Sequence, residues 1–97
     1  MATYIVLVDY TDQGIRNIKD SPKRADALAG LAGKVGVKIK AVYWTSGAHD
    51  GVVVLEAPDD SAISRLMLSI GRLGNVRTQT LRAFNRSEFE TIVGGVE

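Results

Sequence analysis

The chain has no cysteine, a single histidine and almost no net charge. The absence of cysteine excludes disulfides, thiolate metal sites and a cysteine nucleophile. The single histidine excludes a histidine-rich metal site within one subunit. Twelve basic residues against eleven acidic residues leave a formal charge of +1, whereas nucleic-acid binding needs a one-sided excess of Lys and Arg. We therefore predict no metal, no cofactor and no nucleic-acid partner.

Long apolar runs are also missing. No segment approaches the length of a membrane span. The first apolar run has no basic region before it and is interrupted by Asp9, unlike a signal peptide. The sequence thus predicts a cytoplasmic protein without a membrane partner. Hydrophobic residues nevertheless make up 45% of the 97 residues, so we expect one domain over residues 1–97 with its own core.

Four strands and three helices are expected from the apolar patterning. The expected strands cover residues 3–10, 37–45, 50–57 and 76–84, and the expected helices begin at Ser21–Pro22, at Asp59 or Asp60, and at Ser87. Proline is favoured at the first helical position, after a serine N-cap. Ser87 and Glu90 have the spacing of a capping box. The last expected helix therefore begins at residue 87.

The order of these elements is β-α-β-β-α-β with a C-terminal helix, which is typical of the ferredoxin-like α+β fold. Right-handed crossovers then predict a four-stranded antiparallel sheet with strand order 4-1-3-2. Residues 3–10 and 50–57 hold unbroken apolar runs, as central strands do. Residues 37–45 and 76–84 carry basic side chains, as edge strands do.

Two helices cover only one face of such a sheet, although the central strands look buried on both faces. A second copy of the chain is the simplest cover. We therefore predict a homodimer or higher homo-oligomer formed through the sheet face, as in a dimeric α/β barrel. The alternative is a monomer with an exposed apolar face, which is uncommon among soluble proteins.

Strand alternation assigns side chains to the two faces of the sheet. Val37, Ile39, Ala41, Tyr43, Gly51, Val53, Leu55 and Ala57 are expected to face the helices. Ile5, Leu7, Asp9, Lys40, Val42, Trp44, Asp50, Val52, Val54 and Glu56 are expected on the second face. That face is apolar in the middle and charged near its ends, so it suits a dimer interface or a lumen for a small ligand.

The candidate ligand-binding residues gather where strands end. They are Asp9, Tyr10, Tyr43, Trp44, His49 and Asp50. Aromatic rings can stack on a ligand, although packing is their more common role. His49 can act as a base or a haem ligand, but a solvated turn residue is the more common case. Asp50 is expected to accept backbone amide hydrogen bonds. No catalytic residue is predicted.

A second, weaker signal lies at the start of the first long helix. Ser21, Lys23 and Arg24 stand there, and a helix N-terminus can receive an anion. Basic residues on a solvated helix face are the more common explanation.

The chain resembles the GYD-domain family of small bacterial proteins. The resemblance is carried by the segments TYIVLVDYTDQGIRNIKDSPKRA, VYWTSGAHD, EAPDD and LGNVRTQTLRAF. Gly47 and Asp50 match the Gly-Tyr-Asp pattern of the family, while His49 stands where the family usually has Tyr. The resemblance implies a ferredoxin-like fold and no defined activity.

The leading hypothesis for function is a non-enzymatic, oligomeric and regulatory domain that binds a small ligand or a protein partner. The alternative is a small monooxygenase or isomerase of the dimeric α/β-barrel type, with Trp44, His49 and Asp50 in its lumen. A third possibility is a structural protein whose edge strands or terminal helix build larger assemblies.

Overall fold

The central strands of the sheet are the two with unbroken apolar runs. The computed structural model describes residues 1–97. The strands are β1 (Ala2–Tyr10), β2 (Lys38–Trp44), β3 (Gly51–Ala57) and β4 (Val76–Ala83). All pairs are antiparallel and the order is β2-β3-β1-β4. This is the predicted order viewed from the other edge, so the predicted ferredoxin-like α+β fold is confirmed.

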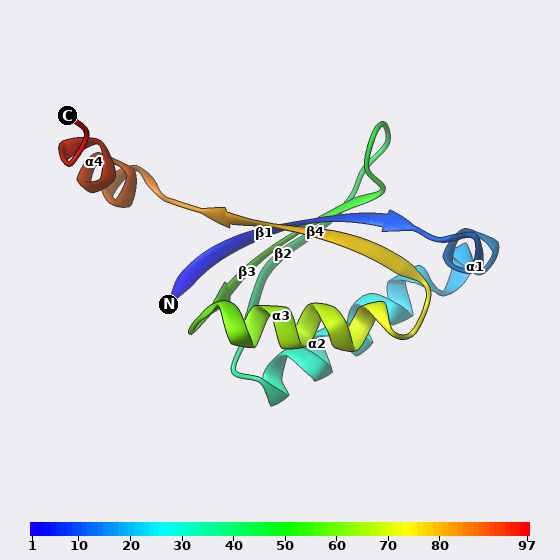
Figure 1. Ribbon diagram of the computed structural model, residues 1–97. Coiled ribbons are helices and arrows are strands. Elements are labelled where there is room, and N and C mark those ends of the chain that lie inside the picture. The colour runs from blue at the N-terminus through cyan, green and yellow to red at the C-terminus, as the bar shows by residue number, and fades with distance from the viewer.

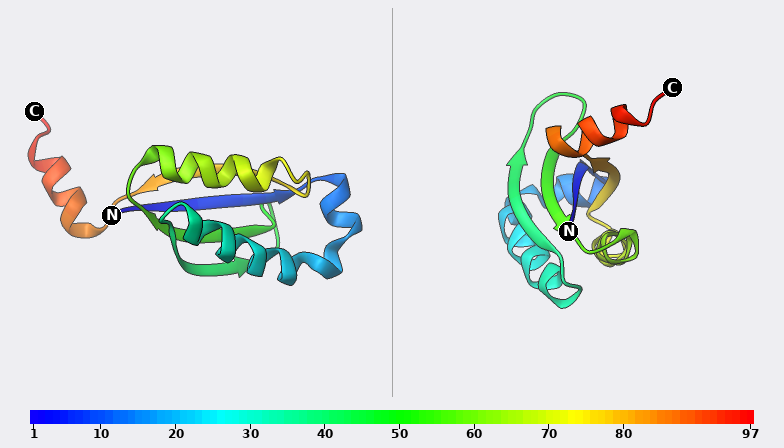
Figure 2. Two further views of the ribbon diagram at one scale, coloured as in Figure 1. Left: turned by 90° about the horizontal axis from the view of Figure 1, so that it is seen from below. Right: turned by 90° about the vertical axis from the view of Figure 1, so that its left-hand side faces the viewer.

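Helices cover one face of this sheet (Figures 1 and 2). The helices are α1 (Asp12–Arg16), the 3-10 helix η1 (Ile18–Asp20), α2 (Ser21–Lys34), α3 (Asp60–Gly71) and α4 (Arg86–Gly94). The core lies between the sheet and the two long helices, α2 and α3, and its most buried large side chains are Leu55, Leu66 and Val6. Burial of each such side chain contributes about 1.5–3 kcal/mol. None of the helices combines the length and apolar character that crossing a membrane requires.

Two helix starts differ from the prediction. Helix α2 follows directly on η1, so Asp20 occupies the N-cap position and Ser21 is already helical. The hydroxyl of Ser21 therefore makes contacts elsewhere. At α4 the capping box joins Asn85 and Glu88, and not Ser87 and Glu90, because the N-cap lies two residues earlier than expected.

A β-bulge in β2 reverses the faces of the second half of that strand. The register shifts between Ile39 and Ala41, after which Val42 pairs with the buried Val53 and Trp44 pairs with Gly51. A bulge places one extra residue on its strand. Val42 and Trp44 therefore face the helices, and Ala41 and Tyr43 face away from them. The predicted assignment of these residues is wrong for this reason.

The other face of the sheet has no helix over it (Figure 1). The alternation of β1 and β3 places partly exposed apolar side chains there, and Tyr43 and Leu81 on the edge strands are 61% and 47% exposed. We call this surface the open face, and it consists of Ile5, Leu7, Ala41, Tyr43, Val52, Val54 and Leu81. The predicted dimeric barrel would cover it.

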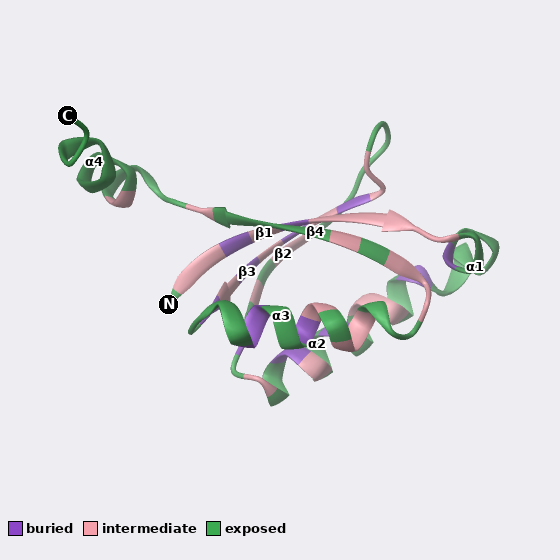
Figure 3. Cartoon of the chain, viewed as in Figure 1, coloured by how far each residue is buried: buried purple, intermediate pink, exposed green.

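Helix α4 lies beyond the end of the sheet, apart from α2 and α3 (Figures 1 and 2). It is exposed along almost its whole length (Figure 3). Phe89, Ile92 and Val93 are 55%, 44% and 49% exposed. The helix thus presents apolar side chains that no part of its own chain covers.

Tyr4 provides a test of the packing between β1 and α3. Its ring is buried, and its hydroxyl donates a hydrogen bond to Asp60 Oδ1. That bond, together with burial, raises the pKa of Tyr4 above its ordinary value of 10.0. We expect Tyr4→Phe to lower the free energy of unfolding near neutral pH by about 1–2 kcal/mol, because a hydrogen bond to a charged group is lost.

The raised pKa also gives this substitution a pH dependence. The native state holds the Tyr4 proton more tightly than the unfolded chain, so its contribution is complete below pH 10.0 and is lost as the pH rises through the native pKa. The difference between the wild type and Tyr4→Phe should therefore shrink at alkaline pH. Urea unfolding on both sides of pH 10.0 measures this, with Tyr43→Phe as the control, because it removes a tyrosine hydroxyl on the open face and leaves the bond between Tyr4 and Asp60 intact. A difference that is constant with pH would contradict the assignment.

Candidate functional site

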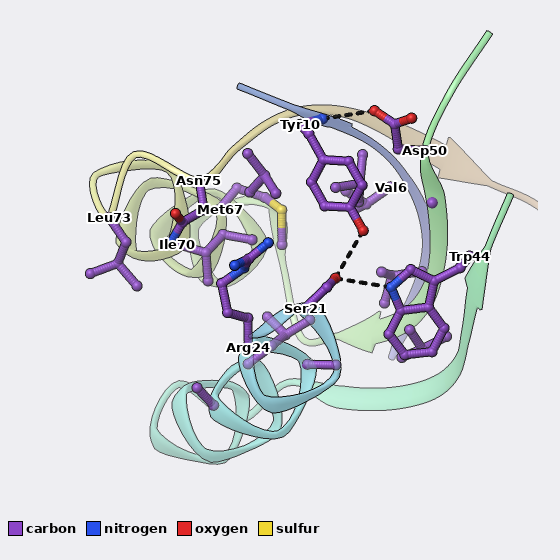
Figure 4. Close-up of a pocket in the computed structure, with 18 of the residues that line it drawn as sticks. Val6, Tyr10, Ser21, Arg24, Trp44, Asp50, Met67, Ile70, Leu73 and Asn75 are labelled. Atoms are coloured by element: carbon purple, nitrogen blue, oxygen red, sulfur yellow. Dashed lines mark hydrogen bonds between the residues drawn. The ribbon is translucent and has the colours of Figure 1, made fainter. Parts of the chain in front are cut away.

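A pocket of about 160 Å³ lies between the sheet and helices α2 and α3 (Figure 4). We call it the helix-side pocket. Of the 20 residues that line it, 15 are hydrophobic. Its apolar walls include Val6, Val8, Leu28, Leu31, Val53, Met67 and Ile70. An apolar pocket with a few polar groups at one end is the usual form of a small-molecule site.

The polar end of the pocket is built around Ser21. Trp44 Nε1 donates a hydrogen bond to Ser21 Oγ at 3.0 Å, and the hydroxyl of Tyr10 lies 2.8 Å from the same oxygen (Figure 4). Ser21 is only 8% exposed. These bonds tie the start of α2 to the ends of β1 and β2. They exist because Ser21 is helical and because the bulge turns Trp44 toward the helices.

Arg24 brings a positive charge to this end of the pocket. Its side chain extends from α2 into the pocket, toward Tyr10 (Figure 4). The guanidinium donates to the carbonyl oxygens of Asn17 and Gly14 at 2.9 and 3.3 Å, and it lies 5.9 Å from the centroid of the Tyr10 ring. No carboxylate of the chain forms an ion pair with it. The charge of Arg24 is therefore balanced by no acidic side chain.

Four of the predicted ligand-binding residues line this pocket. They are Tyr10, Trp44 and Asp50, together with Tyr43, which borders the pocket from β2 while its side chain lies on the open face. Asp50 accepts a hydrogen bond from the backbone amide of Tyr10 at 2.9 Å. An aspartate that accepts from a backbone amide was expected, but the donor is on β1 and not in the β2–β3 turn. Their role in binding a ligand stays a prediction.

Asp9 and His49 lie on the opposite side of the sheet. The β2–β3 loop projects away from α2 and α3 (Figure 1), and His49 Nδ1 lies 3.2 Å from Asp9 Oδ1. The two side chains are 33% and 35% exposed, His49 first. His49 lies in the turn and is partly exposed, and β1 supplies it with a partner, Asp9, that the sequence did not indicate. A carboxylate beside an imidazole fixes its orientation and lets it exchange a proton with a bound molecule.

The roles of Ser21 and Arg24 in this pocket were not predicted. Both residues were expected at a helix start, but the local sequence pattern does not indicate that Tyr10 and Trp44 lie beside them. The contacts of Ser21 join residues that are 11 and 23 positions apart. Nowhere in the chain do three or more carboxylate or imidazole side chains stand close enough to hold a metal ion.

Comparison with known proteins places the chain in a family. The GYD domain family matches residues 4–93. The chain belongs to the GYD domain family. A relative of this GYD domain, from Thermus thermophilus, is named glutamine synthetase and cystathionine beta-lyase binding protein. The two are 37% identical over 84 residues, which cover 86% of this chain and 88% of the relative.

Solved structures share the fold of this GYD domain. A feast or famine regulatory protein of M. tuberculosis, complexed with L-methionine, has a TM-score of 0.67 at 19% identity. The match covers 88% of this chain and 51% of that regulator, so the chain spans about half of its length. TTHA0845 from Thermus thermophilus has a TM-score of 0.56 at 25% identity, over 88% of this chain and 95% of that chain. These similarities agree with the ferredoxin-like topology.

Proposed function

We propose that this GYD domain is a non-enzymatic, oligomeric regulatory protein that binds other proteins. The observation that carries the proposal is the open face, whose apolar side chains stand on the two central strands without cover. A soluble protein rarely leaves such a surface exposed. The name of the relative from Thermus thermophilus, a binding protein, supports a role of the same kind.

The open face has the composition of an interface between two copies. Ile5, Leu7, Val52 and Val54 form its apolar centre. Charged pairs stand around it, with Lys40 Nζ 3.3 Å from Glu56 Oε1 at one edge. An apolar centre with a polar rim is the usual anatomy of a stable interface. In a two-fold dimer the same surface meets itself, so one patch suffices.

Helix α4 is the surface that we propose for the protein partner. Its capping box and an ion pair from Glu88 to Arg82 of β4 stabilise the helix. Phe89, Ile92 and Val93 are exposed on it. An amphipathic helix of this kind binds in a hydrophobic groove of a partner. The relative is named for binding glutamine synthetase and cystathionine beta-lyase, so these two enzymes are the partners to test.

We expect the full chain to bind purified glutamine synthetase or cystathionine β-lyase of its own source organism. Phe89→Ala should weaken this binding at least about tenfold, because a buried aromatic anchor contributes about 2 kcal/mol or more. Surface plasmon resonance with the immobilised chain measures the affinities. Thr91→Ala, on the same helix, is the matched control. Absence of binding to both enzymes, or equal loss in the two variants, would contradict the proposal.

A second candidate function is favoured by one observation, the pairing of His49 with Asp9. An enzyme that works between two open faces would use this pair to move a proton. Trp44, which the sequence placed in such a lumen, lies on the other side of the sheet. A crystal structure of the dimer tests this candidate. Side chains that fill the space beside His49 would rule it out.

A further inference from the structure

We propose that the helix-side pocket binds a small carboxylate that has an apolar body. This site is separate from the open face and from α4, so it goes beyond the proposed function. It adds a small-molecule ligand to a protein-binding domain. The proposal rests on the size of the pocket, on its apolar walls and on the unbalanced charge of Arg24 beside unused hydrogen-bond donors.

The size of the pocket limits the ligand. Its volume of about 160 Å³ is close to that of an apolar cavity of about 150 Å³ that takes up benzene in another protein. The apolar body of the ligand is therefore about as large as one six-membered ring or a short branched chain. The walls of valine, leucine, isoleucine and methionine side chains stabilise such a body by removing it from water.

The charge of Arg24 selects an anionic head group. A guanidinium carries five N–H donors in a planar fork, and the carbonyl oxygens of Asn17 and Gly14 take two of them. Three N–H donors of Arg24 therefore have no acceptor in the protein. The remaining fork matches the two oxygens of a carboxylate. A charge in a partly buried position is stabilised most when an opposite charge arrives with hydrogen bonds.

The hydroxyl pair supplies one further donor. Tyr10 and Ser21 share one hydrogen bond, in which one of their two hydroxyl hydrogens is used. Trp44 donates its own hydrogen to Ser21, so one hydroxyl hydrogen stays available to a ligand. Asp50 is the acidic residue among those that line the pocket. It accepts from the Tyr10 amide and lies beyond Tyr10, on the side away from Arg24 (Figure 4).

Two probes with the same apolar ring and a similar size, one anionic and one neutral, test this proposal. Sodium benzoate and its neutral analogue benzamide are titrated into the full ¹⁵N-labelled chain and followed by amide NMR. We expect benzoate to shift the amides of pocket residues such as Ser21, Met67 and Ile70 in a saturable way. Benzamide should bind at least about tenfold more weakly, because it lacks the charge that meets Arg24. Equal affinity of the two probes, or no saturable shift with benzoate, would overturn the proposal.

Variants separate the contribution of the Arg24 charge to binding from the contribution of the cavity. Arg24→Gln should weaken benzoate binding at least about tenfold and leave benzamide binding unchanged. Ala25→Leu places a larger side chain at the wall of the pocket and should abolish binding of both probes. Lys23→Gln removes an exposed charge from the same turn of α2 and is the matched control. Wild-type benzoate affinity in Arg24→Gln or in Ala25→Leu would overturn the proposal, and the dispersion of each spectrum reports whether the variant is folded.

Discussion

Gly14→Ala should lower the free energy of unfolding by about 3 kcal/mol or more, an unusually large effect for one methyl group. Gly14 is buried in α1. A Cβ atom on it would stand 1.9 Å from the carbonyl oxygen of Asn75 and 2.9 Å from the carbonyl carbon. Both are backbone atoms, so no rotation of a side chain relieves the clash.

The surrounding hydrogen bonds prevent an easy shift of α1. The carbonyl oxygen of Asn75 accepts from the amide of Thr11 at 3.1 Å. Gln13 Nε2 donates to the carbonyl oxygen of Leu73 at 3.1 Å and to Asn75 Oδ1 at 2.9 Å. A movement of α1 large enough to admit the methyl group would lengthen all of these bonds at once. The cost of the substitution therefore includes lost hydrogen bonds as well as steric strain.

Glycines in α2 provide matched controls for this prediction. Apart from the helix's own backbone and the adjoining residues, no atom lies within 4 Å of a Cβ built on Gly30 or Gly33. Alanine is favoured over glycine inside a helix, so Gly30→Ala and Gly33→Ala should each stabilise the chain by about 0.5–1 kcal/mol. Urea unfolding of the three variants gives the comparison. A Gly14→Ala variant as stable as the wild type would show that α1 moves more freely than its bonds suggest.

The strand order could be predicted because burial leaves a strong signal in sequence. Residues 52–55 form an apolar run on β3, and residues 4–8 form one on β1, as is typical of strands with neighbours on each side. Lys38 and Arg77 mark the edge strands. Each of these patterns depends on the local residues alone. They therefore needed no knowledge of contacts between distant segments.

The β-bulge in β2 could not be predicted, because the sequence of that strand has no pattern that indicates it. Up to Ile39, lysine alternates with valine and isoleucine, and one face is distinct from the other. The following Ala41, Val42, Tyr43 and Trp44 are all apolar or aromatic, so both possible registers satisfy the pattern. Pairing with β3 decides between them. Alternation alone therefore could not predict on which face of the sheet Trp44 lies.

The candidate site shows the same limit. A serine before a proline is typical of a helix N-cap, so Ser21 was predicted to be one. In the fold Ser21 instead bonds with Tyr10 and Trp44, which come from two different strands. His49 meets Asp9 from 40 positions away. Side chains that lie apart in sequence assemble both sites, so the residue types were predicted but not their partners.

Leu7→Lys should turn the expected dimer into a monomer without unfolding the chain. Leu7 stands on β1 at the centre of the open face, opposite Val52 on one side and Gln79 on the other. In a two-fold interface the variant would bring two lysines together in an apolar region, and both would have to lose water. We expect the dissociation constant of the dimer to rise at least about 100-fold, which corresponds to about 2.7 kcal/mol.

The mass in solution checks this result against a single chain of 10.4 kDa. Light scattering should give about twice this mass for the wild type and the single-chain mass for Leu7→Lys. Ala29→Lys, on an exposed position of α2, adds the same charge away from the open face and should stay dimeric. A monomeric wild type would contradict the proposal that a second copy covers the open face. A dimeric Leu7→Lys variant would place the interface elsewhere.

Unfolding separates loss of the interface from damage to the fold. Because dimerisation is linked to folding, the unfolding midpoint of the wild type should rise with protein concentration. The Leu7→Lys chain should unfold cooperatively at a midpoint that does not depend on concentration. Leu7 points away from the core formed by Val6, Leu55 and Leu66, so the lysine stays in water in the single chain. The stability lost in the variant is then the part that the second copy contributes.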